Sequence, residues 1–233
     1  MKEISSRISY IEPDHSLDRP LLAYIKGERF SMAFDAGASE GHVKLFYREL
    51  EKENLPLPEL TVISHAHWDH SYGIHAIHGM AIANEKTYEY LKKDSQTSKE
   101  DIFFSSFDAD YDFIRKEYGS PENIIIKLPD IIFRNSLTID LGDVKAKLHH
   151  IPSPHTDDST ILCLKEERIL FAGDASSGTI TSKADLETGG IYDKEKTRAY
   201  LTSITALNPL FIINSHEGAV SAEEEIEYLK SKL

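Results

Sequence analysis

The sequence has little of three things that would direct it to a disulfide scaffold, a membrane or a nucleic acid. It holds one cysteine, Cys163, so no disulfide can form within the chain. Its longest apolar runs, such as 124–126 and 210–213, are far shorter than the ~20 residues of a membrane span. Positive charge is scarce, because 26 Lys and Arg face 39 Asp and Glu, a net charge of -13 that repels polyanions. We therefore expect neither a membrane nor a nucleic acid as a partner.

The N-terminal residues 1–10 also lack the basic and apolar regions of a secretory signal. Together with the single cysteine, this favours a cytoplasmic location. The 233 residues and their 40% hydrophobic content are enough for one sizeable core. No Gly/Ser-rich linker and no short repeat interrupts the sequence. We expect residues 1–233 to form a single domain.

Hydrophobic periodicity predicts two similar halves, each with short strands followed by helix, strand and helix. In the first half we expect strands at 4–11, 21–26, 29–34, 60–64 and 80–83, and helices at 40–53 and 85–93. In the second half we expect strands at 136–141, 145–151, 160–165, 168–172 and 210–214, and helices at 193–207 and 221–233. The last helix begins with a capping box from Ser221 to Glu224. Residues 94–129 mix acidic and aromatic side chains without a clear period, and we interpret them as a partly helical insertion.

The most informative segment comes directly after the strand expected at 60–64. His65, His67, Asp69 and His70 form the pattern His-x-His-x-Asp-His. In a chain of this composition the pattern is expected by chance roughly 0.002 times, so it is specific. Neutral imidazole and carboxylate are the ligands that borderline cations such as Zn²⁺ prefer. The segment therefore predicts a site for a divalent metal.

Three further residues of these types follow apolar strands elsewhere in the chain. His155 comes after the strand expected at 145–151, Asp174 after the strand at 168–172, and His216 after the strand at 210–214. In open α/β sheets, ligands collect at the carboxyl ends of the strands. Residues that are far apart in the sequence can therefore converge on the same crevice.

The order of these motifs resembles that of the metallo-β-lactamase superfamily of hydrolases over nearly the whole chain. The resemblance implies an α/β fold, a four-layered αβ/βα sandwich of two mixed β-sheets flanked by helices, with a dinuclear metal site at one edge between the sheets. The five matching motifs are Asp35-Ala36-Gly37, the segment 65–70, His155, Asp174 and His216.

The resemblance also implies a role for each of these residues. Asp35 is expected behind the ligands, where a carboxylate orients coordinated imidazoles. Asp69 is expected to be a metal ligand and is also a candidate for orienting the bridging hydroxide. Zinc is the default for these ligand types, and iron or manganese also accepts them. By this match one metal ion would be held by His65, His67 and His155, the other by Asp69, His70 and His216, and Asp174 would bridge the two.

The implied activity is hydrolysis of a small ester, thioester, lactone or phosphoester by a hydroxide bound to the dinuclear metal site. True β-lactamases usually carry Arg at the position of His70 and Cys at that of Asp174, which argues against antibiotic hydrolysis. Two other classes stay open. A phosphodiesterase or nuclease requires a basic groove near the site, and a scaffold or sensor would bind metal in a closed coordination shell without catalysis.

Three features are candidates for the surroundings of a small-molecule substrate. Trp68 either forms a wall of the pocket or packs beneath it. Tyr192 lies in a glycine-containing loop from which it could reach the crevice and stabilise an oxyanion. The aromatic segment from Phe103 to Phe113 is a substrate lid, a dimer contact or part of the core. A homodimer therefore remains open.

Overall fold

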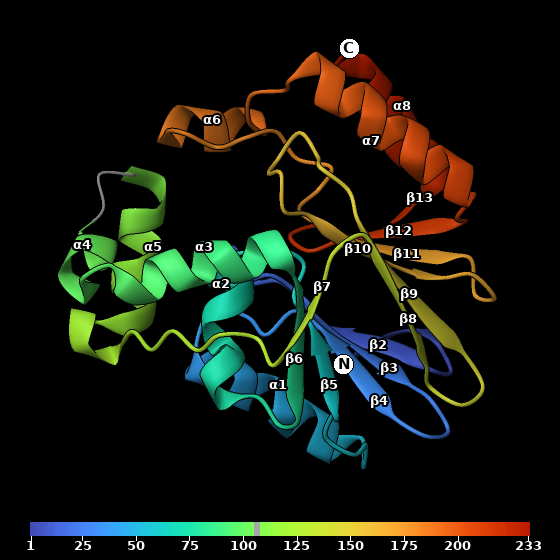
Figure 1. Cartoon of the computed structure of the whole chain (residues 1–233), viewed down its shortest axis with the longest axis horizontal. Coiled ribbons are helices and arrows are strands. Elements are labelled where there is room, and N and C mark those ends of the chain that lie inside the picture. Colours follow the sequence, from blue (N-terminus) through green and yellow to red (C-terminus); the bar gives the residue numbers. More distant parts are fainter. Residues whose placement is uncertain (105–107) are drawn as a thin grey trace.

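The computed structural model describes residues 1–104 and 108–233 (Figure 1). Two mixed β-sheets pack face to face, and helices cover the outer face of each sheet. This confirms the four-layered arrangement that the resemblance implied. In the part of the chain that the structure describes, no helix is both long enough and apolar enough to cross a membrane.

The first sheet has seven strands in chain order. Its first four strands form an antiparallel meander, and β4 to β7 run parallel to one another. Parallel neighbours need crossover connections, which the segments between these strands supply. The strands are β1 (Lys2–Ser5), β2 (Ile8–Ile11), β3 (Leu22–Lys26), β4 (Ser31–Phe34), β5 (Leu60–Val62), β6 (Met80–Asn84) and β7 (Ile131–Phe133).

The second sheet has six strands in the order β13-β12-β11-β10-β9-β8. Its neighbours are antiparallel except for β11 and β12, which are parallel. The strands are β8 (Ser136–Asp140), β9 (Lys145–His150), β10 (Thr160–Leu164), β11 (Ile169–Gly173), β12 (Phe211–Asn214) and β13 (Gly218–Ser221).

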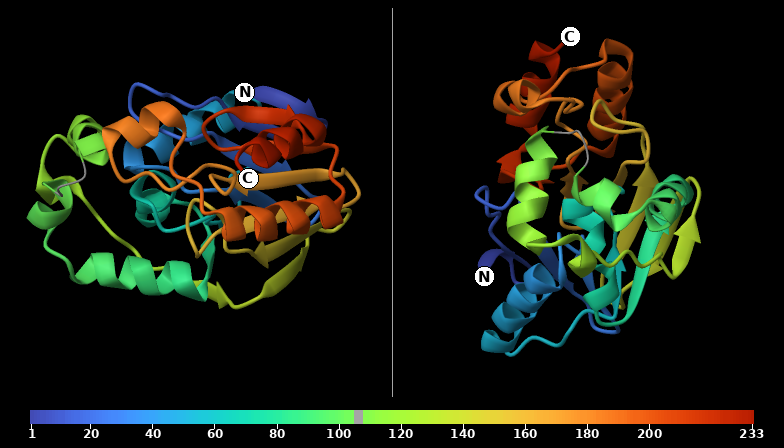
Figure 2. Two further views of the ribbon diagram at one scale, coloured as in Figure 1. Left: turned by 90° about the horizontal axis from the view of Figure 1, so that it is seen from above. Right: turned by 90° about the vertical axis from the view of Figure 1, so that its left-hand side faces the viewer.

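The helices divide between the two outer faces (Figure 2). On the first sheet lie α1 (Glu40–Lys52), α2 (Trp68–Ser71), η1 (Tyr72–Ala76) and α3 (Glu85–Gln96), followed by α4 (Lys99–Phe103), α5 (Asp108–Tyr118) and η2 (Pro121–Asn123). On the second sheet lie α7 (Lys194–Leu207) and α8 (Ala222–Ser231), and the short α6 (Lys183–Thr188) lies beside α5.

Side-chain alternation along the strands explains the layers. In β3, Ala23 and Ile25 point into the core between the two sheets, while Leu22 and Tyr24 pack against α1. The helix presents Phe46 to them, in keeping with its predicted helical spacing. Because successive residues of a strand face opposite sides, one strand can serve two apolar layers. The central core contains side chains from both sheets.

Several short elements differ from the sequence prediction. The run at 4–11 divides into β1 and β2, and β7, β13, α2 and α6 were not predicted. Each of these is three to six residues long. An element of this length spans too few positions for a hydrophobic period to be recognised. The predicted capping box of the last helix is confirmed, with Ser221 as its N-cap and Glu224 as its partner.

Candidate metal centre

Five strand ends meet at one edge of the two sheets, and the candidate ligands follow them. Since β4 is parallel to β5 and β11 to β12, the carboxyl ends of each pair lie at the same edge. Strand β9 runs in the same direction as β11 because both are antiparallel to β10. The loops after these strands carry Asp35, the segment His65 to His70, His155, Asp174 and His216.

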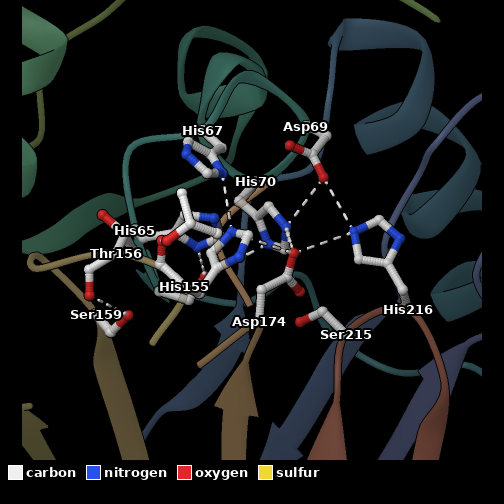
Figure 3. Close-up of polar contacts among 12 residues, drawn as sticks. His65, His67, Asp69, His70, His155, Thr156, Ser159, Asp174, Ser215 and His216 are labelled. Atoms are coloured by element: carbon white, nitrogen blue, oxygen red, sulfur yellow. Dashed lines mark hydrogen bonds and ion pairs between the residues drawn. The ribbon is translucent and has the colours of Figure 1, made fainter. Parts of the chain in front are cut away.

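Three histidines form the first group of donors, here named the imidazole cluster (Figure 3). One ring nitrogen from each of His65, His67 and His155 lies within 4.8 Å of the others. Within this group, the Nε2 atom of His155 lies 3.0 Å from the Nδ1 atom of His67. The buried Nε2 of His65 has no hydrogen-bond partner among the described residues. A buried polar atom without a partner is costly, and a metal ion would satisfy it.

The second group, here named the carboxylate cluster, consists of Asp69, His70, Asp174 and His216. Asp69 Oδ2 is 3.0 Å from His70 Nε2 and 3.1 Å from His216 Nε2. Asp174 Oδ2 is 3.2 Å and 3.4 Å from the same two nitrogens. Two carboxylates and two imidazoles therefore direct their donor atoms at a common point (Figure 3).

Asp174 connects the two clusters. Its Oδ2 lies 3.8 Å from His155 Nε2, in addition to its contacts with His70 and His216. Asp174 therefore lies between the two clusters, and the bridging role that the resemblance gave it stays a prediction. The seven side chains expected as ligands are thus brought together in two adjoining groups.

Asp35 lies behind the carboxylate cluster and is fully buried. Its Oδ2 accepts a hydrogen bond from His70 Nδ1 at 2.8 Å, and its Oδ1 accepts one from the Ser64 backbone N–H at 2.7 Å. Asp35 has a φ of 67°, a left-handed conformation that is unusual for a residue other than glycine. Backbone strain of this kind persists where the surroundings over-determine it, often at functional sites. The contact keeps a proton on Nδ1, so Nε2 is the nitrogen of His70 that would bind a metal once its own proton is displaced.

We expect Asp35→Asn to lower metal affinity about 10–100-fold, the range typical for groups that orient metal-binding histidines. The amide keeps the size of the carboxylate but removes the charge that holds His70. Competition with a chromogenic chelator would measure the affinity. Unchanged affinity in a folded Asp35→Asn protein would show that Asp35 does not act through His70.

The imidazole cluster is suited to bind a cation because its members are neutral. Burial lowers the pKa of His155 to about 4. Burial also lowers the pKa of His65 and of His67, and the other nearby histidines add to the effect on His65. His155 Nδ1 donates to the Gly178 carbonyl at 3.0 Å, which leaves Nε2 as the unprotonated nitrogen. All three rings are therefore competent ligands at neutral pH.

The carboxylate cluster has the opposite electrostatics. Burial disfavours charge there, but mutual attraction outweighs it. The positive charges of His70 and His216 lower the pKa of Asp69 and of Asp174. In return, Asp174 and Asp69 raise the pKa of His70 and of His216 well above the usual value. Without a metal this cluster is a group of ion pairs, whose protons a cation would replace.

This difference predicts two steps of metal binding with different pH dependence. His70 and His216 carry protons at neutral pH, so an ion must displace protons from them, and its affinity for the carboxylate cluster rises as pH rises. Affinity for the imidazole cluster levels off at a lower pH, since the pKa values of its histidines lie below the usual ~6.5 and the rings are already neutral. Calorimetric titration at pH 7 in buffers of different ionisation enthalpy should show proton release in one step only. Equal proton release in both steps would contradict the conclusion that the imidazole cluster is neutral and the carboxylate cluster protonated at pH 7.

Asp158 is part of the site's support, and sequence reasoning did not find it. It is buried, and its Oδ2 accepts hydrogen bonds at 2.9 Å from the Ala66 backbone N–H and from Thr87 Oγ1. Its Oδ1 accepts one from Thr156 Oγ1 at 2.6 Å. The carboxylate therefore ties the loop of the His-x-His-x-Asp-His motif to the loop of His155 and to α3. Its position three residues after His155 was the available signal.

Gly173, directly before Asp174, is a second residue whose role appears only in the structure. It has a φ of 61°, and a Cβ at this position would lie 2.7 Å from Ser64 Cβ. Ser64 Oγ lies 3.0 Å from Asp35 Oδ2 and 2.9 Å from His65 Nδ1. A side chain at Gly173 would therefore push against the residue that links Asp35 to the imidazole cluster.

Trp68 and Tyr192, the two residues expected near the substrate, contact residues outside the set of seven candidate ligands. Trp68 is buried in the apolar layer outside the first sheet, with its ring centroid 6.4 Å from that of Tyr118. The Tyr192 hydroxyl lies 3.1 Å from the Ser176 carbonyl oxygen, to which it donates, and 2.8 Å from the Tyr228 hydroxyl. Burial raises the pKa of Tyr192, so it stays protonated.

The aromatic segment divides between core and surface. Phe103 is buried in the apolar layer outside the first sheet, and Phe113 packs against that layer. Phe104 is 57% exposed and stacks edge-on against Phe103. Phe107 and the side chain of Tyr111 lie outside the described residues. Part of the segment thus belongs to the packing of the insertion.

The fold and the two clusters define a class of protein: a two-sheet α/β sandwich with His and Asp donors consistent with a binuclear metal site. Residues 24–216 match the family model described as "Metallo-beta-lactamase superfamily". Since this match spans most of the sequence, the chain belongs to the metallo-β-lactamase superfamily. No curated protein matches the sequence.

Solved structures show the same fold at low sequence identity. A metallo-β-lactamase from Pontibacter korlensis is 16% identical, with a TM-score of 0.70, and the match covers 99% of this chain and 96% of that one. The sec-alkyl sulfatase PisA1, as a double mutant, has a TM-score of 0.68 at 14% identity, with 99% of this chain and 40% of that one covered. The DIM-1 metallo-β-lactamase has a TM-score of 0.65 at 15% identity, with 99% and 94% covered.

Proposed function

We propose that this protein is a metal-dependent hydrolase that acts on a small molecule with an ester, thioester, lactone or phosphoester bond. The observation that carries the proposal is the pair of adjoining donor clusters that share Asp174. Neutral imidazoles in one cluster and crowded carboxylates in the other form a donor set that suits two divalent cations. Zinc is the ion we expect first, and iron or manganese would also suit these donors.

Each of the two clusters would hold one metal ion. His65, His67 and His155 would hold one ion, Asp69, His70 and His216 the other, and Asp174 would touch both. When bound, such ions lower the pKa of water toward neutrality and polarise the oxygen of the bond to be cleaved.

The chain's own residues position the reaction. Asp69 is the carboxylate that we place next to the reacting water, where it would orient the water by accepting a hydrogen bond from it. Asp35 holds the His70 ring through Nδ1, and Gly178 holds the His155 ring in the same way. The water oxygen bonds to the electrophilic carbon or phosphorus as the bond to the leaving oxygen or sulfur breaks. The proton lost by the water ends on the leaving group.

A nuclease is the less favoured alternative. Its polyanionic substrate would have to approach a chain of net charge -13. On α1, His42 is buried and burial lowers its pKa to about 3, while Lys44 is paired with Glu40 at 2.7 Å. A groove of free cations is therefore not formed by these residues.

The metal-loaded protein is expected to hydrolyse at least one member of a panel of small esters, thioesters, lactones and phosphoesters. Activity should disappear with a chelator and return with Zn²⁺ or Mn²⁺. Elemental analysis beside the kinetics would count the bound ions. Two bound ions with no turnover across the panel would instead support a metal-binding scaffold or sensor.

A further inference from the structure

A small pocket adjoins the carboxylate cluster on the side of α8. It lies between the ends of β11 and β12 and the first turns of α8, and its volume is about 40 Å³. A water molecule needs roughly 10–15 Å³ of such space, so the pocket takes one small group. Its walls include Asp174 and His216 from the carboxylate cluster, and also Ser176, Asn214, Glu225 and Tyr228.

Two of these lining residues, Glu225 and Asn214, carry buried oxygen atoms to which no hydrogen-bond donor of the described residues is paired. Glu225 is 4% exposed and Asn214 is 7% exposed. Asn214 Nδ2 donates to Glu225 Oε2 at 3.0 Å. The remaining oxygens, Glu225 Oε1 and Asn214 Oδ1, have no hydrogen-bond partner within the described part of the chain. Buried acceptors without a donor are costly, and a bound group that donates hydrogen bonds to them would offset this cost.

The charge of the pocket indicates the sign of that group. Carboxylates of Asp174, Glu217 and Glu225 line it, against one cation, His216, whose pKa is raised. None of its lining residues, all of them described, is Lys or Arg. Burial raises the pKa of Glu225, although the hydrogen bond from the Asn214 amide acts in the other direction. A guest with a positive charge and N–H donors would stabilise the buried carboxylate and satisfy both oxygens.

We propose that this pocket binds a primary ammonium group of the substrate, with Glu225 and Asn214 as its acceptors. The proposal rests on the proposed hydrolase function and narrows its substrate class. Because Asp174 and His216 belong both to the pocket walls and to the carboxylate cluster, the ammonium group lies close to the bond that is cleaved. The substrates that fit are amino-acyl esters or thioesters with a free amine near the carbonyl.

The first test measures binding without turnover. Methylammonium chloride, added to the metal-loaded protein, should raise Tm by roughly 2–4 °C more than NaCl, KCl or tetramethylammonium chloride at equal ionic strength. Glu225→Gln should abolish this difference. Glu223→Gln, an exposed position on the same helix with the same loss of charge, should keep it. Equal stabilisation by all four salts, or an undiminished difference in Glu225→Gln, would overturn the proposal.

The second test measures specificity. An α-aminoacyl ester and the matching acyl ester without the amine, with the same leaving group, should differ in kcat/KM by at least about 10-fold in the wild-type protein, as expected for a buried polar pair. Glu225→Gln should bring this ratio close to one, and Glu225→Asp, which keeps the charge, should retain part of it. A ratio near one in the wild type would contradict the proposal. Hydrolysis of neither ester would count against the hydrolase function, and the methylammonium test would still decide the pocket.

Discussion

Replacement of Asp174 by Asn is expected to lower kcat/KM of the metal-loaded protein on the order of 10³-fold. The reason is its position. Asp174 Oδ2 lies 3.2 Å from His70 Nε2, 3.4 Å from His216 Nε2 and 3.8 Å from His155 Nε2, so one carboxylate touches both clusters. An amide of the same shape removes the negative charge that two cations would share.

Kinetics and metal content must be measured on the same Asp174→Asn sample. We expect the loss of activity to accompany a fall in bound metal from two ions toward one. Asp101→Asn is the matched control, because Asp101 is an exposed aspartate on α4. Full activity in Asp174→Asn with two bound ions would refute the bridging role.

Removal of metal is expected to lower Tm by roughly 8–16 °C relative to protein that holds metal at about 1,000 times its dissociation constant. At that saturation, binding to the folded state alone contributes ~4 kcal/mol, and each kcal/mol corresponds to about 2–4 °C in a chain of this size. The donors meet only in the folded chain, because they come from loops that follow four different strands. Calorimetry with and without a chelator measures the change.

Two variants separate site-specific binding from a general effect of cations. His65→Asn removes a buried donor whose Nε2 lacks a partner among the described residues, and it should lose much of the metal-dependent rise in Tm. His15→Asn removes an exposed histidine and should behave like the wild type. Equal metal-dependent stabilisation in both variants would mean that the ions bind elsewhere.

Much of the fold was accessible from the sequence because its long elements have clear periods. The strand prediction 21–26 and the helix prediction 40–53 each agree with β3 and α1 to within one residue, since both have strong apolar patterns. The prediction was incomplete at β7 and β13, which have three and four residues and lie at the edges of their sheets. Such strands form through pairing with a neighbour, and their own sequence carries a weak pattern.

The sequence by itself determined which donors are available, because imidazoles and carboxylates at strand ends are visible as residue types and spacings. Only the tertiary structure decided how they pair: Asp174 between two clusters, His70 held by Asp35, and Asp158 joining three segments. The physical reason is that hydrogen bonding and burial depend on distances between residues far apart in the chain. The same reason places Trp68 in an apolar layer, and it makes Glu225, one of many acidic residues in the sequence, a buried carboxylate beside the site.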